Sequence, residues 1–283
     1  MPGKPPVYIE KIVDLDESMQ KIVNNLKPNK KVEKIAIKLN LCDFRLPETG
    51  AVSDPVVVES LLKALLGAYP SARIIMMEND ATSVRADFMF RYLGFDKMAE
   101  KLSVEVANIA HSDWITRTVD GYRMKTVEVP SFLEDCDLVV THPKLKTHSM
   151  TKLTCGLKNM FGCHRKKRKV TYHKFLDDAI VDINLAVRPN LSIVDANICH
   201  EGIGGPSYGF PKKVGLIMGS ADVVALDAFC ARLIGFNPWF VGHIRKAAAK
   251  GLGSMGCETF GDCKKTRFEF NKPLYYAMKV MRL

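Results

Sequence analysis

The chain has 283 residues and a formal net charge of +10, from 41 Lys and Arg against 31 Asp and Glu. A hydrophobic fraction of 47% with 25% charged residues is typical of a folded globular protein and excludes wholesale disorder. No apolar run approaches the roughly 18 residues of a membrane span, and the N-terminus has no apolar stretch of signal-peptide length. We therefore expect a cytoplasmic protein with no membrane partner.

The first half of the chain alternates between strand and helix patterns. Residues 34–41 alternate with period two, and residues 72–77 form a second apolar strand. Between them, residues 54–69 begin with Asp-Pro and continue as the apolar stripe of a helix. Residues 85–102 predict one or two helices broken at Gly94. Short strands are then predicted at 104–109, 114–119 and 124–129.

The second half continues the alternation. Strands are predicted at 137–141, 191–195 and 214–219, helices at 175–186, 222–233 and 241–251, and a glycine-rich loop at 202–209. Strands that alternate with helices imply an α/β fold with a mostly parallel sheet flanked by helices. We expect a single domain over residues 1–283, and two α/β lobes that meet near residues 130–140 remain an alternative.

Polar side chains stand where these strands end. They are Lys38 and Asn40 after the first strand, Glu78 after 72–77, Lys144, Lys146 and His148 after 137–141, Asp195 and Asn197 at the end of 191–195, and Asp222 at the start of 222–233. Ligands of parallel α/β sheets bind at the carboxyl ends of strands. Any one of these residues alone is more often a structural cap, but together they predict a binding site.

The charge of the chain is concentrated in one segment. Between Leu138 and Phe175 there is no Asp or Glu, and ten Lys and Arg lie there. The rest of the chain has 31 basic and 31 acidic residues and is formally neutral. We interpret residues 141–174 as a basic functional segment.

Within this segment the spacing of Thr151, Thr154 and Lys158 predicts a helix that begins near Met150. Lys144 and Lys146 just before that start would be unfavourable unless an anion sits on the helix N-terminus. The segment also holds His148 and His173, and histidine titrates nearest neutral pH. Nearby lysines would lower the pKa of such a histidine and keep it a neutral base.

The cysteines do not form a recognisable metal motif. Eight are scattered without a CxxC pair, so a ferredoxin-type cluster motif is absent from this sequence. The group Cys155, Cys163, His164 and His173 lacks the paired spacing of a zinc site, as does Cys199–His200–Glu201. We therefore assign no metal ligands and leave the cofactor unknown, with a divalent ion on Asp195 or Asp222 still open.

Four stretches resemble the family of domains of unknown function numbered 362. They are residues 38–55, 141–163, 193–211 and 219–238, and they follow the order of that family. The resemblance adds Asn159 and Gly205 to the residues expected to bind a ligand. The family pattern also picks out Asp54, Pro206 and Asp227. Many members carry ferredoxin-type modules, which hints at redox metabolism. This chain has no clustered cysteines, so the resemblance leaves a separate redox partner open rather than a cluster of its own.

The first hypothesis is an enzyme that acts on a small anionic carboxylate or phosphate. Its catalytic residues would be His148, His173, Lys146 and Asp195, and its ligand-binding residues Lys38, Asn40, Lys144, Lys158, Asn159, Gly205 and Asp222. The alternative is a nucleic-acid-binding protein that uses residues 144–174. A metal or iron–sulfur accessory protein is the second alternative. The basic run at 165–169 has no assigned role.

Overall fold

A computed structural model describes residues 3–165, 169–202 and 208–281 of the chain. In this part of the chain a ten-stranded sheet has the order β12-β1-β11-β10-β7-β2-β3-β4, with β8 on β10 and β9 on β8. The strands are β1 (Pro6–Lys11), β2 (Lys34–Lys38), β3 (Arg73–Glu78), β4 (Glu105–Asn108), β7 (Leu138–Thr141), β8 (Lys144–His148), β9 (Lys152–Thr154), β10 (Leu191–Glu201), β11 (Phe210–Ser220) and β12 (Glu258–Phe260).

The centre of this sheet is parallel. Strands β10, β7, β2, β3 and β4 are neighbours that run in one direction. Antiparallel pairs occur where β11 meets β10 and β1, and where β9 meets β8. This arrangement confirms the predicted α/β fold with a mostly parallel sheet.

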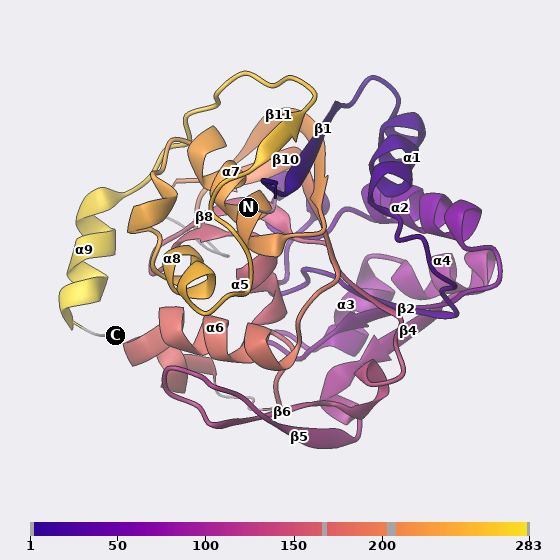
Figure 1. Cartoon of the computed structure of the whole chain (residues 1–283), viewed down its shortest axis with the longest axis horizontal. Helices are drawn as coiled ribbons and strands as arrows, with labels where there is room; N and C mark the ends of the chain where they lie inside the picture. The colour runs from indigo at the N-terminus through magenta and orange to yellow at the C-terminus, as the bar shows by residue number, and fades with distance from the viewer. Residues whose placement is uncertain (1–2, 166–168, 203–207, 282–283) are drawn as a thin grey trace.

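Helices cover both faces of the sheet (Figure 1). On one face lie α1 (Leu15–Leu26), α2 (Pro55–Ala68), α3 (Ala86–Tyr92) and α4 (Phe95–Leu102). On the other lie α5 (Gly156–Met160), α6 (Leu176–Ala186), α7 (Val223–Leu233) and α8 (Gly242–Ala249), together with the hairpin of β5 (Trp114–Thr118) and β6 (Thr126–Pro130). The last helix, α9 (Lys272–Met281), lies at one edge of the molecule. No helix in the described ranges is long and apolar enough to cross a membrane.

Alternate side chains of each central strand enter different cores. Ile35 and Ile37 of β2 pack with α1 and α2, whereas Ala36 between them packs on the side of α5–α8. This is the period of two that the strand pattern predicts. All three side chains are fully buried, which explains why the residues on both faces of this strand are apolar.

Several elements differ from the sequence predictions. The strand β1 and the helix α1, which Asp14 caps by accepting from the backbone N–H of Glu17 at 2.8 Å, were not predicted. The predicted helix near Met150 is wrong, because the chain turns there into β9 and α5 begins only at Gly156. Lys152 has φ of +66°, a left-handed conformation that interrupts any helix. Strands from both sides of residues 130–140 share the one sheet.

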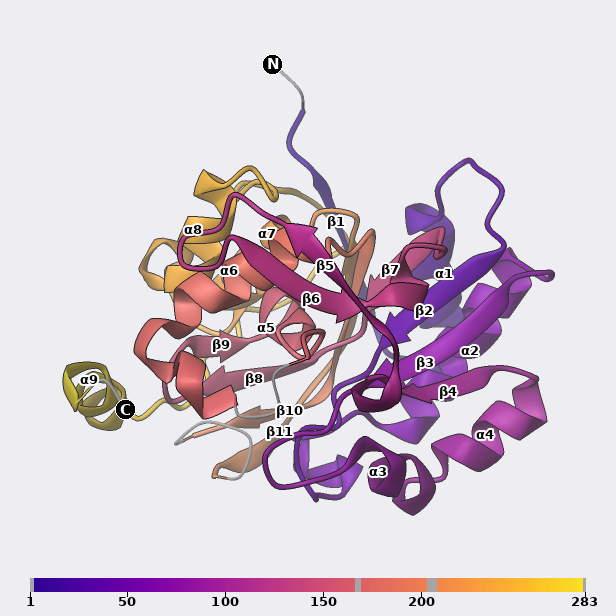
Figure 2. The ribbon, with the colours of Figure 1, turned by 90° about the horizontal axis from the view of Figure 1, so that it is seen from below.

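The path of β8 opens a space beside β2. The strands β2 and β7 pair as far as Lys38 and Thr141, and the chain then continues from β7 into β8. Strand β8 runs along β10, where Lys144 lies opposite Asp195, and no longer beside β2. Figure 2 shows β2, β3 and β4 on one side of the molecule and β8–β11 on the other. The connections from β2 and β7 thus diverge at the carboxyl ends of these strands, where parallel α/β folds bind ligands.

Candidate functional site

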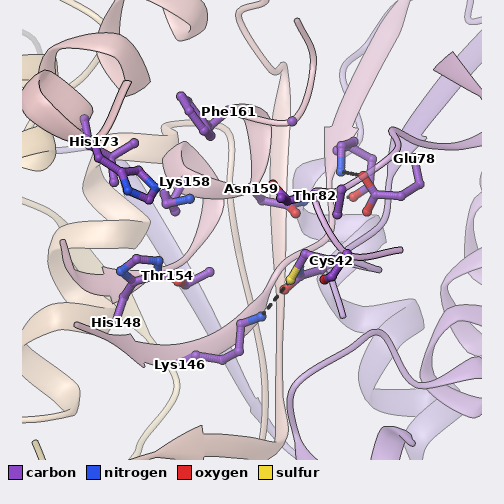
Figure 3. Close-up of a pocket in the computed structure, with 16 residues that line it drawn as sticks. Cys42, Glu78, Thr82, Lys146, His148, Thr154, Lys158, Asn159, Phe161 and His173 are labelled. Atoms are coloured by element: carbon purple, nitrogen blue, oxygen red, sulfur yellow. Dashed lines mark hydrogen bonds and ion pairs between the residues drawn. The ribbon is translucent and has the colours of Figure 1, made fainter. Parts of the chain in front are cut away.

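A cavity of about 270 Å³ lies where β2 and β8 diverge. Seven predicted site residues line it: Lys38, Asn40, Lys146, His148, Lys158, Asn159 and His173. The other lining residues are Cys42, Glu78, Ala81, Thr82, Ser83, Thr154, Phe161, Gly162 and Leu176. In Figure 3 the two histidines and Lys158 form one wall, and Glu78 and Thr82 face them from the other. The structure therefore gathers residues from β2, β3, β8, α5 and the 3₁₀ helix η4 (Lys169–Phe175) around one space.

A buried ion pair forms the wall beside β2 and β3. Lys38 Nζ contacts Glu78 Oε1 and also donates to the carbonyl of Leu39 at 2.8 Å. The second oxygen of Glu78 accepts from the backbone N–H of Leu41 at 2.7 Å. Both charged side chains are at most 4% exposed, so each depends on the other for compensation. The pair ties the loop after β2 to the end of β3.

Asn40 follows this pair and adds a polar group to the cavity. Its Nδ2 donates to Cys42 Sγ at 3.3 Å, and its backbone N–H donates to Ser53 Oγ at 2.8 Å. Its Oδ1 is buried and has no donor among the residues that the structure describes. A buried acceptor of this kind is costly unless a water or ligand supplies a donor.

Strand β8 brings Lys146 and His148 to the cavity from one face, because residues two apart point the same way. Lys146 is 1% exposed, and its Nζ donates to the carbonyl of Ala51 at 2.8 Å and contacts Cys42 Sγ at 3.8 Å (Figure 3). Burial lowers the pKa of Lys146, because the charged ammonium is poorly solvated there.

The turn before Ala51 depends on a glycine. Gly50 has φ of +70°, and an added Cβ would lie 2.1 Å from the carbonyl oxygen of Cys199. No other residue type fits both the backbone conformation and this close approach. Gly50 thereby allows the carbonyl of Ala51 to reach Lys146.

Helix α5 carries Lys158 and Asn159, and a carboxylate from α7 holds its start. Asp227 accepts from the backbone N–H groups of Gly156 at 2.8 Å and Leu157 at 3.0 Å. Asn159 Nδ2 donates to the carbonyl of Lys38 at 3.0 Å, so α5 is tied to the end of β2. Because Asp227 occupies these amides, the helix N-terminus is not the anion site that the sequence predicted.

Both histidines of the cavity favour the neutral state. Burial lowers the pKa of His148 well below its ordinary value, and the nearby charges of Lys158 and Lys146 lower it further. Burial and Lys158 likewise lower the pKa of His173. The Nδ1 of His148 accepts from the backbone N–H of Met150 at 3.1 Å. The neutral ring therefore carries its proton on Nε2.

Three predicted site residues lie outside the cavity lining. Lys144 Nζ contacts Asp195 Oδ2 at 2.9 Å, and both side chains are 1% exposed within the sheet. Asp222 caps α7, where it accepts from the backbone N–H of Ala225 and of Ser254, each at 2.9 Å. Because these interactions already occupy the charged groups of Lys144, Asp195 and Asp222, the three residues have a structural role. The predicted Gly205 lies outside the described residues.

Some residues around the cavity were not assigned to the site from the sequence. Glu78 was named among the polar residues at strand ends, but it was given no role in the site. Cys42, Thr82 and Ser83 lie in loops without a periodic pattern, so no feature of the sequence marked them as site residues. Asp227, which holds α5, is among the residues that the family pattern picks out, but it was not assigned to the site. Its apolar helix pattern gives no sign of its contact with Leu157, 70 positions away.

The first lysines of the basic segment point into the protein interior. Lys144 and Lys146 are each 1% exposed, and Arg165 contacts Glu128 at 2.7 Å. The two buried lysines cannot reach the phosphates of a nucleic acid in this structure, so that hypothesis depends on the rest of the segment. Residues 166–168 of the basic run lie outside the described ranges. Within those ranges no three His, Cys, Asp or Glu side chains are grouped as a metal site would require.

Comparisons with known proteins place the chain in a family. It is 26% identical over 253 residues to the thylakoid-associated protein sll1697 of Synechocystis sp., an alignment that covers 83% of this chain and 72% of that protein. The lactate racemase apoprotein of Thermoanaerobacterium thermosaccharolyticum is a structural neighbour with a TM-score of 0.52 and 12% identity. That match covers 81% of this chain and 57% of the racemase, and it shows a shared fold alone. The model of the domain of unknown function DUF362 matches residues 35–232, more than half of the chain, and the protein therefore belongs to the DUF362 family.

Proposed function

We propose that this protein is an enzyme that binds a small carboxylate or phosphate in the cavity and transfers a proton to or from it. The observation that carries the proposal is the meeting of Lys146, Lys158, His148 and His173 around one space. These residues come from β8, α5 and η4, so the fold rather than local sequence brings them together. A volume of about 270 Å³ suits a metabolite of a few carbon atoms.

The charge of the cavity supports an anionic ligand. Its described lining has three lysines, Lys38, Lys146 and Lys158, but Glu78 as the one carboxylate, and Glu78 already pairs with Lys38. Because burial favours the neutral amine of Lys146, Lys158 gives the lining its excess of positive charge. An anion would add the negative charge that the lining lacks, in a place where burial strengthens electrostatic attraction.

The histidines support a proton transfer. The neutral ring of His148 carries its proton on Nε2, and such a group can donate a hydrogen bond to an oxygen that becomes negative. His173 lines the same cavity, and its lowered pKa keeps it a neutral base near pH 7. One histidine would then stabilise charge while the other moves the proton.

A thermal-shift screen of small carboxylates and phosphates tests the proposal. A ligand at one hundred times its Kd should stabilise the protein by about 2.7 kcal/mol. Lys158→Gln should weaken binding about tenfold or more, because it removes a charged hydrogen-bond donor from the cavity.

Lys174→Gln is the matched control, since Lys174 is an exposed lysine of the same segment that does not line the cavity. Equal ligand-induced shifts for the Lys158 and Lys174 variants and the unaltered protein would contradict the assignment of this cavity.

A further inference from the structure

We infer that Lys146 is a nucleophilic amine that forms a Schiff base with the carbonyl group of a small 2-oxo acid. The inference rests on the proposed function, because it concerns the same cavity, and it narrows the ligand to acids with a carbonyl beside the carboxylate. Lys146 would then form a covalent bond with the ligand.

The buried lysines of the site differ in their partners. Lys38 contacts Glu78, and Lys144 contacts Asp195 at 2.9 Å, so both ammonium groups have a carboxylate. Lys146 has no salt bridge to any residue in the described part of the chain. Its Nζ instead meets the carbonyl of Ala51 and the sulfur of Cys42. Lys146 is as buried as Lys144, yet it lines the cavity and Lys144 does not.

A buried lysine without a carboxylate is favoured as the neutral amine. Desolvation lowers the pKa of Lys146, and the charge of Lys144 lowers it further, while Cys42 and Asp43 act in the opposite direction. An ordinary lysine is neutral in only about one molecule in 2,500 at pH 7. Each unit by which the pKa falls raises that fraction about tenfold. The lowered pKa thus raises the share of the neutral amine, whose lone pair can attack a carbonyl, on the wall of the cavity.

The contacts of Lys146 leave its lone pair available. The Nζ donates a hydrogen to the carbonyl of Ala51 at 2.8 Å, and this bond orients the amine without occupying the lone pair. Gly50 holds that carbonyl in place through its left-handed backbone and its close approach to Cys199. The amine is therefore held in one position by a backbone group rather than by a charge.

The reaction balances without an oxidant or reductant. The lone pair of Nζ attacks the carbonyl carbon of the acid, and a proton passes from nitrogen to the former carbonyl oxygen to give a carbinolamine. Loss of that hydroxyl with a proton, as one water molecule, leaves the imine. The Nε2–H of His148, two residues further along β8 and lining the same cavity, can donate a hydrogen bond to the departing oxygen and stabilise the negative charge that develops on it. Lys158 supplies a positive charge for the carboxylate of the acid.

Reductive trapping tests the inference. The intact protein is incubated at pH 7 with pyruvate and cyanoborohydride, and each lysine peptide is analysed by mass spectrometry. We expect a carboxyethyl group on Lys146 at a yield at least tenfold above that on the exposed Lys174, and none on the buried Lys144. Lactate, the 2-hydroxy analogue without a carbonyl, should compete and lower the labelling of Lys146.

Two variants separate the chemistry from binding. Lys146→Arg should abolish the adduct at this position, and Lys158→Gln should lower it at a given pyruvate concentration. If Lys146→Arg fails to fold, peptide mapping of the unaltered protein still shows whether the carboxyethyl group is on Lys146. Labelling confined to exposed lysines overturns the Schiff base.

The same samples distinguish this failure from failure of the proposed function. A thermal shift by pyruvate or lactate that Lys158→Gln removes, without an adduct on Lys146, leaves the anion site standing and rejects the covalent step. An absence of both adduct and thermal shift across the whole panel of acids rejects both.

Discussion

Replacement of Glu78 by Gln should destabilise the protein strongly, although the two side chains have nearly the same size. Glu78 accepts from Lys38 Nζ, from the backbone N–H of Asn79 at 2.8 Å and from that of Leu41 at 2.7 Å. Gln keeps one acceptor oxygen and replaces the other with a donor, so Lys38 loses its anion and one donor loses its acceptor. Removal of one partner of a buried ion pair costs about 3–5 kcal/mol. Urea denaturation monitored by circular dichroism measures this loss.

The other end of β3 offers a matched control. Arg73 and Glu105 pair there, but their side chains are 60% and 47% exposed. Glu105→Gln makes the same chemical change in water, which screens the charge, so it should cost a small fraction of the loss at Glu78. Similar losses for the two variants would refute the claim that burial makes the Lys38–Glu78 pair structurally important.

Three further predictions concern charge, backbone and pH. Lys158→Gln should raise the pKa values of His148 and His173, which Lys158 lowers, and NMR titration should show no such change in Lys174→Gln. Gly50→Ala should destabilise the protein more than Gly94→Ala in urea denaturation, because both glycines have positive φ but only the first would place a Cβ against backbone. Burial raises the pKa of Asp227 to about 6 from 3.8, so the folded state disfavours its ionised form. Relative to Asp227→Asn, the protein should therefore lose about 3 kcal/mol of stability as the pH rises from about 4 to above 6, and parallel stability curves would contradict this.

The apolar pattern predicted the central elements of the fold because these elements bury side chains on regular faces. The period of two at 34–41 marks β2, and the Asp-Pro start at residue 54 marks α2, whose cap is Asp54. The break at Gly94 correctly separates α3 from α4, since Gly94 takes a positive φ between them. These signals are local, and they can be recognised without the rest of the chain.

Strand β8 was not predicted because its buried residues are charged. Lys144 and Lys146 alternate with Leu145 and Thr147 in a pattern typical of a strand with one solvated face, yet the structure buries both lysines. The charge of Lys144 is compensated by Asp195, 51 residues away, through the register of β8 against β10. Such compensation depends on the fold, so local pattern rules fail at this position.

The same reason limits the prediction of the site. The rule that ligands bind at the carboxyl ends of parallel strands predicts that Lys38, Asn40 and His148 lie close together, and these three residues line one cavity. It identifies an end of the sheet but not the direction of each side chain. Asp195 lies at that end, but it points at Lys144 rather than into the cavity, and no local feature of the sequence distinguishes these outcomes.

The most direct test of the anion site is the NMR spectrum of the histidine rings with and without the tightest ligand from the screen. We expect the imidazole resonances of His148 and His173 to move on saturation. Those of His111, a surface histidine beside Asp87, should stay unchanged. Movement confined to His111, or no movement of the cavity histidines when the ligand is bound, would contradict the central claim that this cavity holds the ligand.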